Sequence, residues 1–261
     1  MRTFTFKSLF LTVLFMLLGS LAIQAADDGL ITRQIKLDEA GTLPDKISAN
    51  EKNLITNLKI VGKINGTDLK FIREMAGRGV YGGKTDGKLS ILDLSEAKIV
   101  EGGDAYFLYW GSYNINGYYT SNDKLGDGAF SGCSGLTSLT IPSGVTSIGN
   151  YAFNGCSGLT SIYVYPENLP ELGTDIFTGC DAKNCTVYVP KGTYDAYKSS
   201  EFGYFEKIVE FDASGIDKVT TSANAKEVSR YSANGQRLSA PAKGLNIVKY
   251  SVGSVKKVVV Q

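Results

Sequence analysis

The chain has 261 residues, of which 43% are hydrophobic and 20% are charged, and its formal net charge is +1. This composition is ordinary for a folded protein with one long domain or two smaller ones. The near-zero charge argues against binding to nucleic acid or to a membrane surface. The sequence contains no histidine, which excludes serine–histidine and cysteine–histidine nucleophile pairs, histidine-ligated zinc and imidazole acid–base chemistry.

The first 25 residues follow the pattern of a secretory signal peptide. Arg2 and Lys7 precede a short apolar run over 9–18, and small residues follow it, as in the basic, apolar and cleavage regions of such peptides. We expect cleavage after Ala25 or Ala26 and export to the cell surface or the medium, with the periplasm as a further destination. The alternative is a single N-terminal membrane anchor, but the run is short for a span. No integral membrane segment is expected after cleavage.

Residues 26–53 form a polar lead-in with a turn signal at Pro44. We expect this segment to act as a cap that covers the open apolar edge of the repeats that follow it. From residue 54 onward the pattern changes, and alternating apolar residues over 54–62 predict a strand.

A short helix is predicted over 68–75, because Leu69, Ile72 and Met75 share one face of a helix at that spacing. Thr67 or Asp68 is the expected N-cap, since both side chains can accept a bond from a free backbone N–H. The next strand is predicted over 89–95, where leucines recur with L-x-x-L-x-L spacing.

Residues 101–124 form an insert that is rich in aromatic side chains. Half of the residues in 106–119 are aromatic, and the only tryptophan of the chain is among them. Tyr109, Trp110 and Tyr113 are therefore candidate contact residues, because such rings stack on sugars or anchor a protein partner.

The alternative interpretation of the insert is structural. Phe107, Trp110 and Ile115 would then pack the long loop onto the coil beneath it, since a patch of this size left exposed would promote aggregation.

A self-similar stretch occupies residues 125–190. The pattern L-G-x-x-A-F-x-x-C-x-x-L-x-x-L-x-I begins at Leu125, returns 23 residues later at Ile148, and returns in drifted form at Leu172. A period in the twenties with L-x-x-L-x-L spacing is typical of a leucine-rich repeat solenoid. We predict such a solenoid over 54–211, with short parallel strands and helical or irregular outer segments. One coil cannot bury its apolar residues alone, so its phenylalanines should line up in a shared interior: Phe130, Phe153 and Phe177.

The chain has four cysteines. Cys133, Cys156 and Cys180 occupy one position of the repeat, beside the phenylalanine, as small interior residues. Because the repeat explains three of the four, we expect all four cysteines to be free and structural. Two alternatives remain open, namely a bridge along the stack and a small loop closed by Cys180 and Cys185.

Beyond the repeats, a short helix over 194–199 and a strand over 207–211 are predicted to cap the far end of the solenoid. The pattern changes again at residue 212, after which short β segments flank an Asn234-Gly235 turn and a Val252-Gly253 turn. Residues 212–261 are therefore predicted to form a small all-β module of hairpins.

The repeats resemble those of the BspA-like, or Treponema-type, leucine-rich repeat proteins. That family's repeat reads I-G-x-x-A-F-x-x-C-x-x-L-x-x-I-x-I-P, and residues 125–142 follow it closely. The second copy has Tyr165 where proline is expected, and the third has Ile176 where alanine is usual. Residues 54–124 and 212–261 are similar to the N-terminal part and to the C-terminal sorting modules of such proteins in anaerobic bacteria. The resemblance implies an exported or cell-surface protein, and some members are adhesins; it brings no catalytic residues.

The strand positions suggest a binding face. In an L-x-x-L-x-I strand, the residue between the last two apolar positions points outward. Tyr163 and Tyr188 should be neighbours on this face, where tyrosines make good contacts at low entropy cost, although the pair could serve only to stabilise the sheet. The outward residues are Lys59, Asp93, Thr140, Tyr163 and Tyr188.

Short motifs predict no cofactor or metal site. Residues 77–82 match G-x-G-x-x-G, but they follow a predicted helix instead of opening one. The segment at Asp123 resembles a calcium loop, but Leu125 stands at a ligand position. No catalytic, cofactor-binding or metal-binding residues are predicted.

These observations favour a non-catalytic binding protein, an adhesin or surface protein that engages protein or glycan on host matrix or on other cells. The alternative is a carbohydrate-binding accessory protein of the cell envelope, with Trp110 and the nearby tyrosines as its sugar platform. The sequence leaves open the identity of the partner and the oligomeric state.

Overall fold

The computed structural model describes residues 31–110, 114–213, 227–232, 237–240, 244–250 and 255–260. The predicted signal peptide, 1–25, and Tyr113 lie outside the described residues. The chain divides into two compact units, Met1–Ala213 and Ser214–Gln261.

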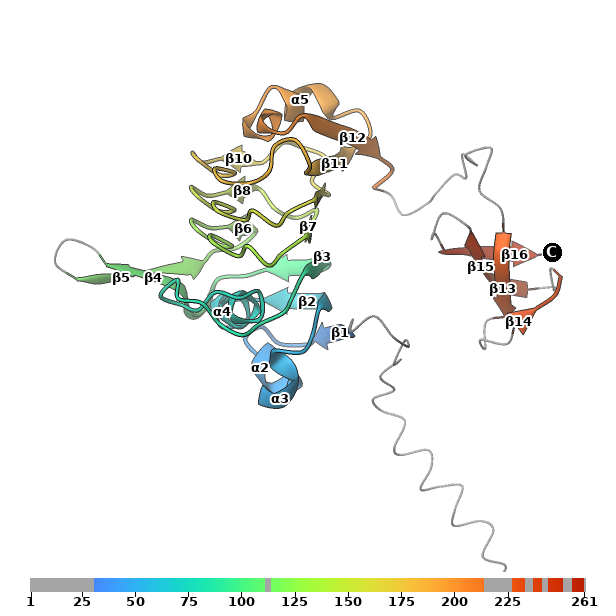
Figure 1. Cartoon of the computed structure of the whole chain (residues 1–261), viewed down its shortest axis with the longest axis horizontal. Coiled ribbons are helices and arrows are strands. Elements are labelled where there is room, and N and C mark those ends of the chain that lie inside the picture. Colours follow the sequence, from blue (N-terminus) through green and yellow to red (C-terminus); the bar gives the residue numbers. More distant parts are fainter. Residues whose placement is uncertain are drawn as a thin grey trace, which may run out of the picture. The chain divides into compact units, whose positions relative to one another are not determined.

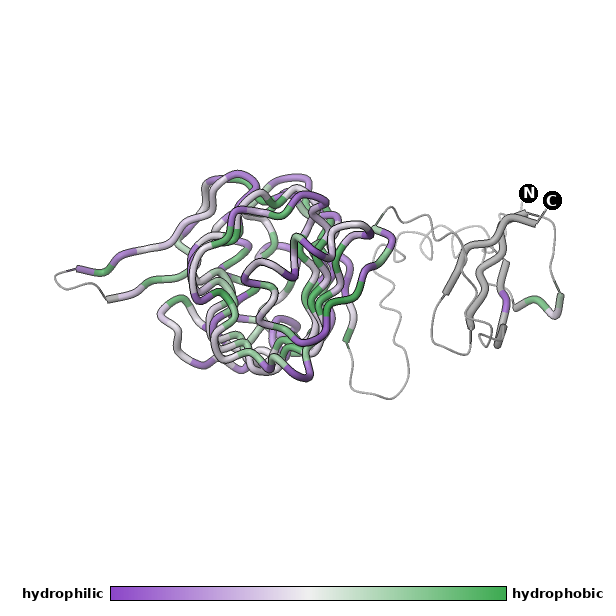
Figure 2. The backbone as a smooth tube through the Cα atoms, turned by 90° about the horizontal axis from the view of Figure 1, so that it is seen from above, coloured by the Kyte–Doolittle hydropathy of each residue, from purple (hydrophilic) through white to green (hydrophobic). Residues whose placement is uncertain are grey.

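The first unit is built on a parallel sheet of seven strands (Figure 1). Each strand pairs with the next strand of this sheet along the chain, so the chain advances by one strand with each coil. The predicted leucine-rich repeat solenoid is therefore confirmed, and a view from above the stack shows successive coils following nearly the same path (Figure 2). The strands are, in order, β1 (Thr32–Leu37), β2 (Asn57–Ile64), β3 (Ile91–Ile99), β7 (Ser138–Ile141), β9 (Ser161–Val164), β11 (Thr186–Pro190) and β12 (Lys207–Phe211).

The lead-in segment contributes a strand that the sequence did not predict. β1 pairs in parallel with β2 and forms one edge of the sheet, and only Leu37 of its residues is buried. Two short helices, α2 (Leu43–Lys46) and α3 (Ala49–Lys52), follow it. The lead-in thus extends the sheet.

The helix α4 (Gly66–Met75) lies on the outer side of the first coil. The predicted N-cap is wrong, because Asn65 caps the helix by accepting a bond from the N–H of Thr67 (3.0 Å). Asp68 has another role. Its carboxylate accepts bonds from the backbone N–H groups of Asn65 (2.9 Å) and Leu43 (2.9 Å). Asp68 therefore ties α4 to the lead-in.

In the later coils, two-residue strands replace the helix. β6 (Lys124–Leu125), β8 (Ser147–Ile148) and β10 (Glu171–Leu172) pair in parallel as a second, narrow sheet. The predicted insert is an antiparallel hairpin of β4 (Gly102–Trp110) and β5 (Ile115–Thr120). It projects from the side of the solenoid where these short strands lie (Figure 1).

The phenylalanines of the repeat form a continuous column inside the solenoid, as predicted. The ring centroids of Phe130 and Phe153 are 5.9 Å apart and those of Phe153 and Phe177 are 5.7 Å apart, with interplanar angles of 5° and 7°. Phe202 and Phe205 close the column at its far end, each with its centroid 4.9 Å from that of Phe177. All five rings are buried.

Backbone hydrogen bonds join the coils at the same positions. The N–H of Phe130 donates to the carbonyl of Ala152 (2.7 Å), and the N–H of Phe153 donates to the carbonyl of Ile176 (3.0 Å). Each coil therefore presents its carbonyls to the coil before it.

The first regular coil has no identical coil before it, and side chains supply the missing donors. Arg73 of α4 donates to the carbonyls of Ala129 (2.9 Å) and Ser131 (3.4 Å), and the Tyr106 hydroxyl donates to that of Asp127 (2.9 Å). Both donor side chains are fully buried. Burial lowers the pKa of the Arg73 guanidinium, but a guanidinium stays charged at neutral pH.

The four cysteines are buried and free, as predicted. The thiols of Cys156 and Cys180 contact the carbonyl oxygens of Phe130 (3.1 Å) and Phe153 (3.3 Å) in the coil before each. The thiols thus belong to the same coil-to-coil ladder as the phenylalanines.

At the far end of the first unit, α5 (Tyr194–Lys198), the 3-10 helix η2 (Glu201–Tyr204) and β12 close the stack, near the predicted positions. The second unit contains an antiparallel sheet in the order β14-β13-β15-β16. Its strands are β13 (Glu227–Ser232), β14 (Arg237–Leu238), β15 (Gly244–Tyr250) and β16 (Val255–Val260). The two predicted turns, at 234–235 and 252–253, lie outside the described residues.

Replacing Phe153 by alanine should destabilise the solenoid by about 3–5 kcal/mol, because it leaves a cavity in the middle of the column. Chemical denaturation followed by circular dichroism measures this change. Tyr194→Ala is the control, since that side chain is 41% exposed, and it should cost less than about 0.5 kcal/mol. Equal effects of the two substitutions would contradict the claim that the phenylalanine column stabilises the solenoid.

Stability should fall as the pH rises above the ordinary range of a thiol. Burial raises the pKa of Cys133 to about 11, whereas a thiol in the unfolded chain ionises near pH ~8.5. Between these two pH values the folded state keeps the proton of Cys133, whereas the unfolded state has released it. The free energy of unfolding therefore falls as the pH rises from about 8.5 toward 11. The unfolding free energy measured across this range should depend less on pH in Cys133→Ala, and an unchanged slope would refute this reasoning.

Candidate functional site

One outward-facing position recurs in every strand of the seven-stranded sheet. The register of the strands places these residues side by side, in a line that we call the outer row. Four of the five predicted outward residues are half-buried members of it, Lys59, Asp93, Tyr163 and Tyr188. From β1 to β12, the outer row is Gln34, Lys59, Asp93, Thr140, Tyr163, Tyr188 and Val209.

The fifth predicted residue, Thr140, is buried, so its prediction as a contact residue is wrong. It occupies the expected place in the outer row, but it is only 9% exposed. Its neighbours in the row are Asp93 and Tyr163, whose side chains extend further from the sheet than that of a threonine. Thr140 therefore offers little surface to a partner.

The N-terminal half of the row is charged. The ammonium of Lys59 lies 2.7 Å from a carboxylate oxygen of Glu96 and 3.5 Å from one of Asp93. The hydrogen bond to Glu96 raises the pKa of Lys59. One cation is therefore shared by two carboxylates, which leaves a surplus of negative charge.

The C-terminal half of the row is aromatic. The rings of Tyr163 and Tyr188 stack with centroids 4.5 Å apart and an interplanar angle of 7°. Phe211 meets Tyr163 and Tyr165 edge-on, with centroid distances of 6.2 and 5.1 Å. Burial raises the pKa of both Tyr163 and Tyr165. These hydroxyls stay protonated at neutral pH and can donate hydrogen bonds.

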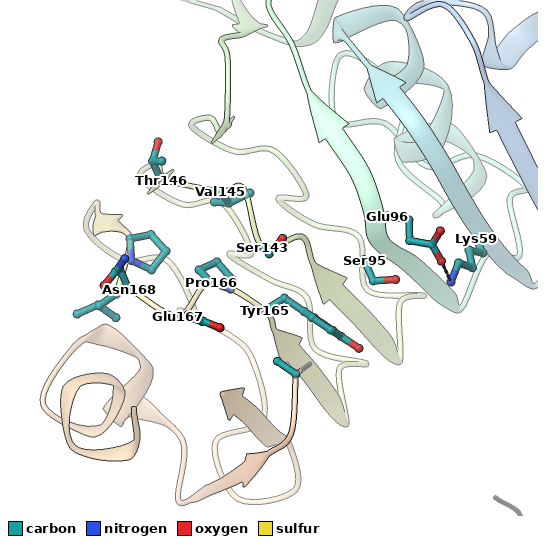
Figure 3. A pocket seen from close by; sticks show the side chains of 13 residues that line it. Lys59, Ser95, Glu96, Ser143, Val145, Thr146, Tyr165, Pro166, Glu167 and Asn168 are labelled. Atoms are coloured by element: carbon teal, nitrogen blue, oxygen red, sulfur yellow. Dashed lines mark ion pairs between the residues drawn. The ribbon is translucent and has the colours of Figure 1, made fainter. Parts of the chain in front are cut away.

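A groove of about 830 Å³ opens beside the outer row, between the middle of β3 and the segments that follow β7 and β9. Figure 3 shows the ring of Tyr165 pointing toward the strands that carry Ser95, Glu96 and Lys59. The groove is lined by Lys59, Ser95, Glu96, Ser143, Val145, Thr146, Tyr165, Pro166, Glu167, Asn168, Leu169, Pro170 and Ala213.

A β-bulge shapes one wall of this groove. The pairing of β2 and β3 shifts register after Lys59 and Asp93, and Val61 then pairs with Glu96. The carboxylate of Asp93 accepts a bond from the N–H of Ser95 (2.9 Å), which holds the extra residue in place. Bulges redirect side chains in this way beside many binding sites. Here Ser95 and Glu96 both line the groove.

The groove was not predicted from the sequence, although one of its residues departs from the repeat pattern. Tyr165 stands where the repeat pattern has proline, and this departure marks the aromatic side chain of the groove wall.

The groove also has a surplus of negative charge. Glu96 is 58% exposed, and Glu167 makes no ion pair within the part of the chain that the structure describes. The groove therefore combines an aromatic ring with surplus carboxylates.

The hairpin carries the remaining candidates. Tyr109 is 38% exposed and stacks on Tyr118 with centroids 4.9 Å apart. The side chain of Trp110 lies outside the described residues, as does Tyr113. Phe107 packs against the core, as the structural interpretation predicted, but Ile115 is 42% exposed and does not. The hairpin and the sheet of seven strands lie on different sides of the solenoid (Figure 1).

The comparisons with known proteins support this architecture. Residues 123–232 match the family model of the BspA type leucine rich repeat region, with six copies of the repeat. The chain carries BspA-type leucine-rich repeats. No curated protein matches it. BspA-type repeats point to a protein-binding role at a surface. The outer row from Thr140 to Val209 lies on strands within the matched residues, and the row continues onto β1, β2 and β3 before them.

Among the described residues, no helix is both long and apolar enough to span a bilayer. The same residues contain no group of three or more cysteine, aspartate or glutamate side chains placed to hold a metal ion.

The stack of Tyr163 on Tyr188 should contribute to stability independently of any ligand. Comparison of Tyr163→Ala, Tyr188→Ala and the double variant should give a coupling energy of about 0.5–1.5 kcal/mol, because cross-strand aromatic pairs interact by that amount. Urea denaturation provides the measurement. Strictly additive effects would mean that the two rings do not support each other.

Proposed function

We propose that the protein is an exported, non-catalytic binding protein that holds a protein partner, on host matrix or on another cell, against the outer row and the groove. The observation that carries the proposal is the placement of the stacked Tyr163–Tyr188 pair beside a groove walled by Tyr165. Aromatic side chains at the centre of a contact surface contribute most of the binding energy in protein complexes.

The sheet makes these contacts favourable. The outer-row tyrosines are fixed by strand pairing on both sides and by ring stacking, so little side-chain freedom remains to be lost on binding. A preorganised surface of this kind needs no rearrangement to meet a partner.

The charges indicate which part of a partner the groove favours. Glu96 and Glu167 both line it, and Lys59 is already paired with Glu96 and Asp93. An arginine or lysine of the partner can stack on the ring of Tyr165 and pair with the carboxylates. We therefore infer a partner with an exposed basic side chain at the centre of its contact surface.

The chain termini belong to the same proposal. Residues 1–25 would direct export and then be removed, and the unit beyond residue 212 would serve as a sorting module that brings the solenoid to the cell surface. This role rests on its resemblance to the sorting modules described above.

Binding of the mature protein to a panel of purified host matrix proteins and to isolated cell envelopes tests the proposal. At least one partner should bind, and Tyr163→Ala/Tyr188→Ala should weaken that binding about tenfold or more. Glu96→Gln/Glu167→Gln should weaken it too and reduce its dependence on salt, because charge pairing is screened.

Tyr194→Ala is the matched control, since it removes an exposed tyrosine of α5 instead of one on the outer row. The absence of any partner, or equal binding by the wild-type protein and both groove variants, would refute the proposal.

A further inference from the structure

One position of the repeat has left-handed backbone in all three regular coils. It is Gly128 in the first, with φ of 62°, Tyr151 in the second, with φ of 55°, and Asp175 in the third, with φ of 53°. Glycine adopts this conformation without cost, but for a bulky side chain it is strained. The Tyr151 side chain is also 49% exposed. Burial therefore does not offset the strain, and the solenoid itself gains little from a tyrosine here.

Tyr151 lies beside the hairpin. The ring of Phe107, from β4, is 3.3 Å from the place where a Cβ on Gly128 would be. The next coil is stacked directly on this position, because the N–H of Gly128 donates to the carbonyl of Asn150 (2.8 Å). The residue after Asn150 is Tyr151, one coil above the contact between the hairpin and the solenoid.

The hairpin presents further rings on the same face. Phe107 pairs with Tyr118, and Tyr109 lies two residues further along β4, so alternation places all three on one face. The ring centroids of Phe107 and Tyr118 are 6.0 Å apart. Burial raises the pKa of Tyr118, and Tyr109, Asp127 and Tyr151 add to this shift, in keeping with their proximity. We call Tyr109, Tyr118 and Tyr151 the tyrosine surface.

The chemistry of this surface is neutral. Residues 105–120 include no charged side chain, in contrast to the carboxylates of the groove. An amide accompanies the rings, because Asn116 pairs with Tyr109 across the hairpin. Aromatic faces pack against the C–H groups of a sugar ring, while phenol and amide groups bond to its hydroxyls. A charged ligand would find no counter-charge among these residues.

We propose that the tyrosine surface is a binding site for a neutral carbohydrate, separate from the protein-binding groove. The backbone strain at Tyr151 supports this assignment, because strained residues that do not stabilise the fold are concentrated at functional sites. The carbohydrate site and the groove use different elements, so each can be removed without the other.

An array of neutral oligosaccharides of glucose, galactose, mannose and xylose, probed with the mature protein, tests the proposal. The wild-type protein should bind at least one of them. Tyr151→Gly removes the ring and relieves the strain, so its binding should fall about tenfold or more while its melting temperature stays equal or rises. Tyr151→Phe keeps ring and strain and should retain most of the binding.

Tyr163→Ala separates this site from the proposed function, because it alters the outer row and should leave oligosaccharide binding unchanged. If the wild-type protein binds an oligosaccharide but no protein partner, the groove is refuted and the tyrosine surface stands. The proposal is overturned if the wild-type protein binds no neutral oligosaccharide, or if Tyr151→Gly binds as tightly as the wild-type protein.

Discussion

The structure depends on one repeated contact, in which each coil stacks a phenylalanine ring and a small thiol on the coil before it and accepts that coil's backbone N–H groups with its carbonyls. Such a contact works only where a coil has a neighbour, so both ends of the stack need substitutes. Phe202 and Phe205 complete the column at the far end. At the near end Arg73 and Tyr106 supply donors to the carbonyls of the first regular coil. A guanidinium suits this place because its several donors lie in one plane and can reach neighbouring carbonyls together.

The same arginine links the stack to the hairpin. The Arg73 guanidinium lies 4.8 Å from the centre of the Phe107 ring, an arrangement in which a cation stabilises an aromatic ring. Tyr106, the next residue back, bonds to the first regular coil. The base of the hairpin is thus fixed by the group that ends the ladder, and the rings further out are held in place beside the coils. Two surfaces result, one built by the strands and one by the hairpin, and both take their rigidity from the stack.

The repeat pattern allowed the column, the parallel strands and the free cysteines to be predicted, because every coil must bury the same positions. The repeat pattern did not predict features that depend on a single contact. β1 is an edge strand that buries only Leu37, so its sequence has little apolar pattern. The N-cap is Asn65 because the neighbouring Asp68 also serves the lead-in, a contact between distant segments. The groove depends on a bulge at Ser95 that no sequence pattern marks. Tyr165 departs from the repeat in the sequence, but its place in the groove wall follows only from the structure, where it lines the same groove as Glu96.

Hydrogen exchange of the amides between the coils tests most directly whether the stack is held from its ends. The amides of Phe130 and Phe153 each donate to the next coil, and in the wild-type protein both should exchange only through global unfolding. In Arg73→Met the first regular coil loses the donors that the guanidinium supplies, so the amide of Phe130 should exchange faster while that of Phe153 keeps more of its protection. Unchanged exchange at Phe130 would contradict the account, because the ladder would then need no donor at its end.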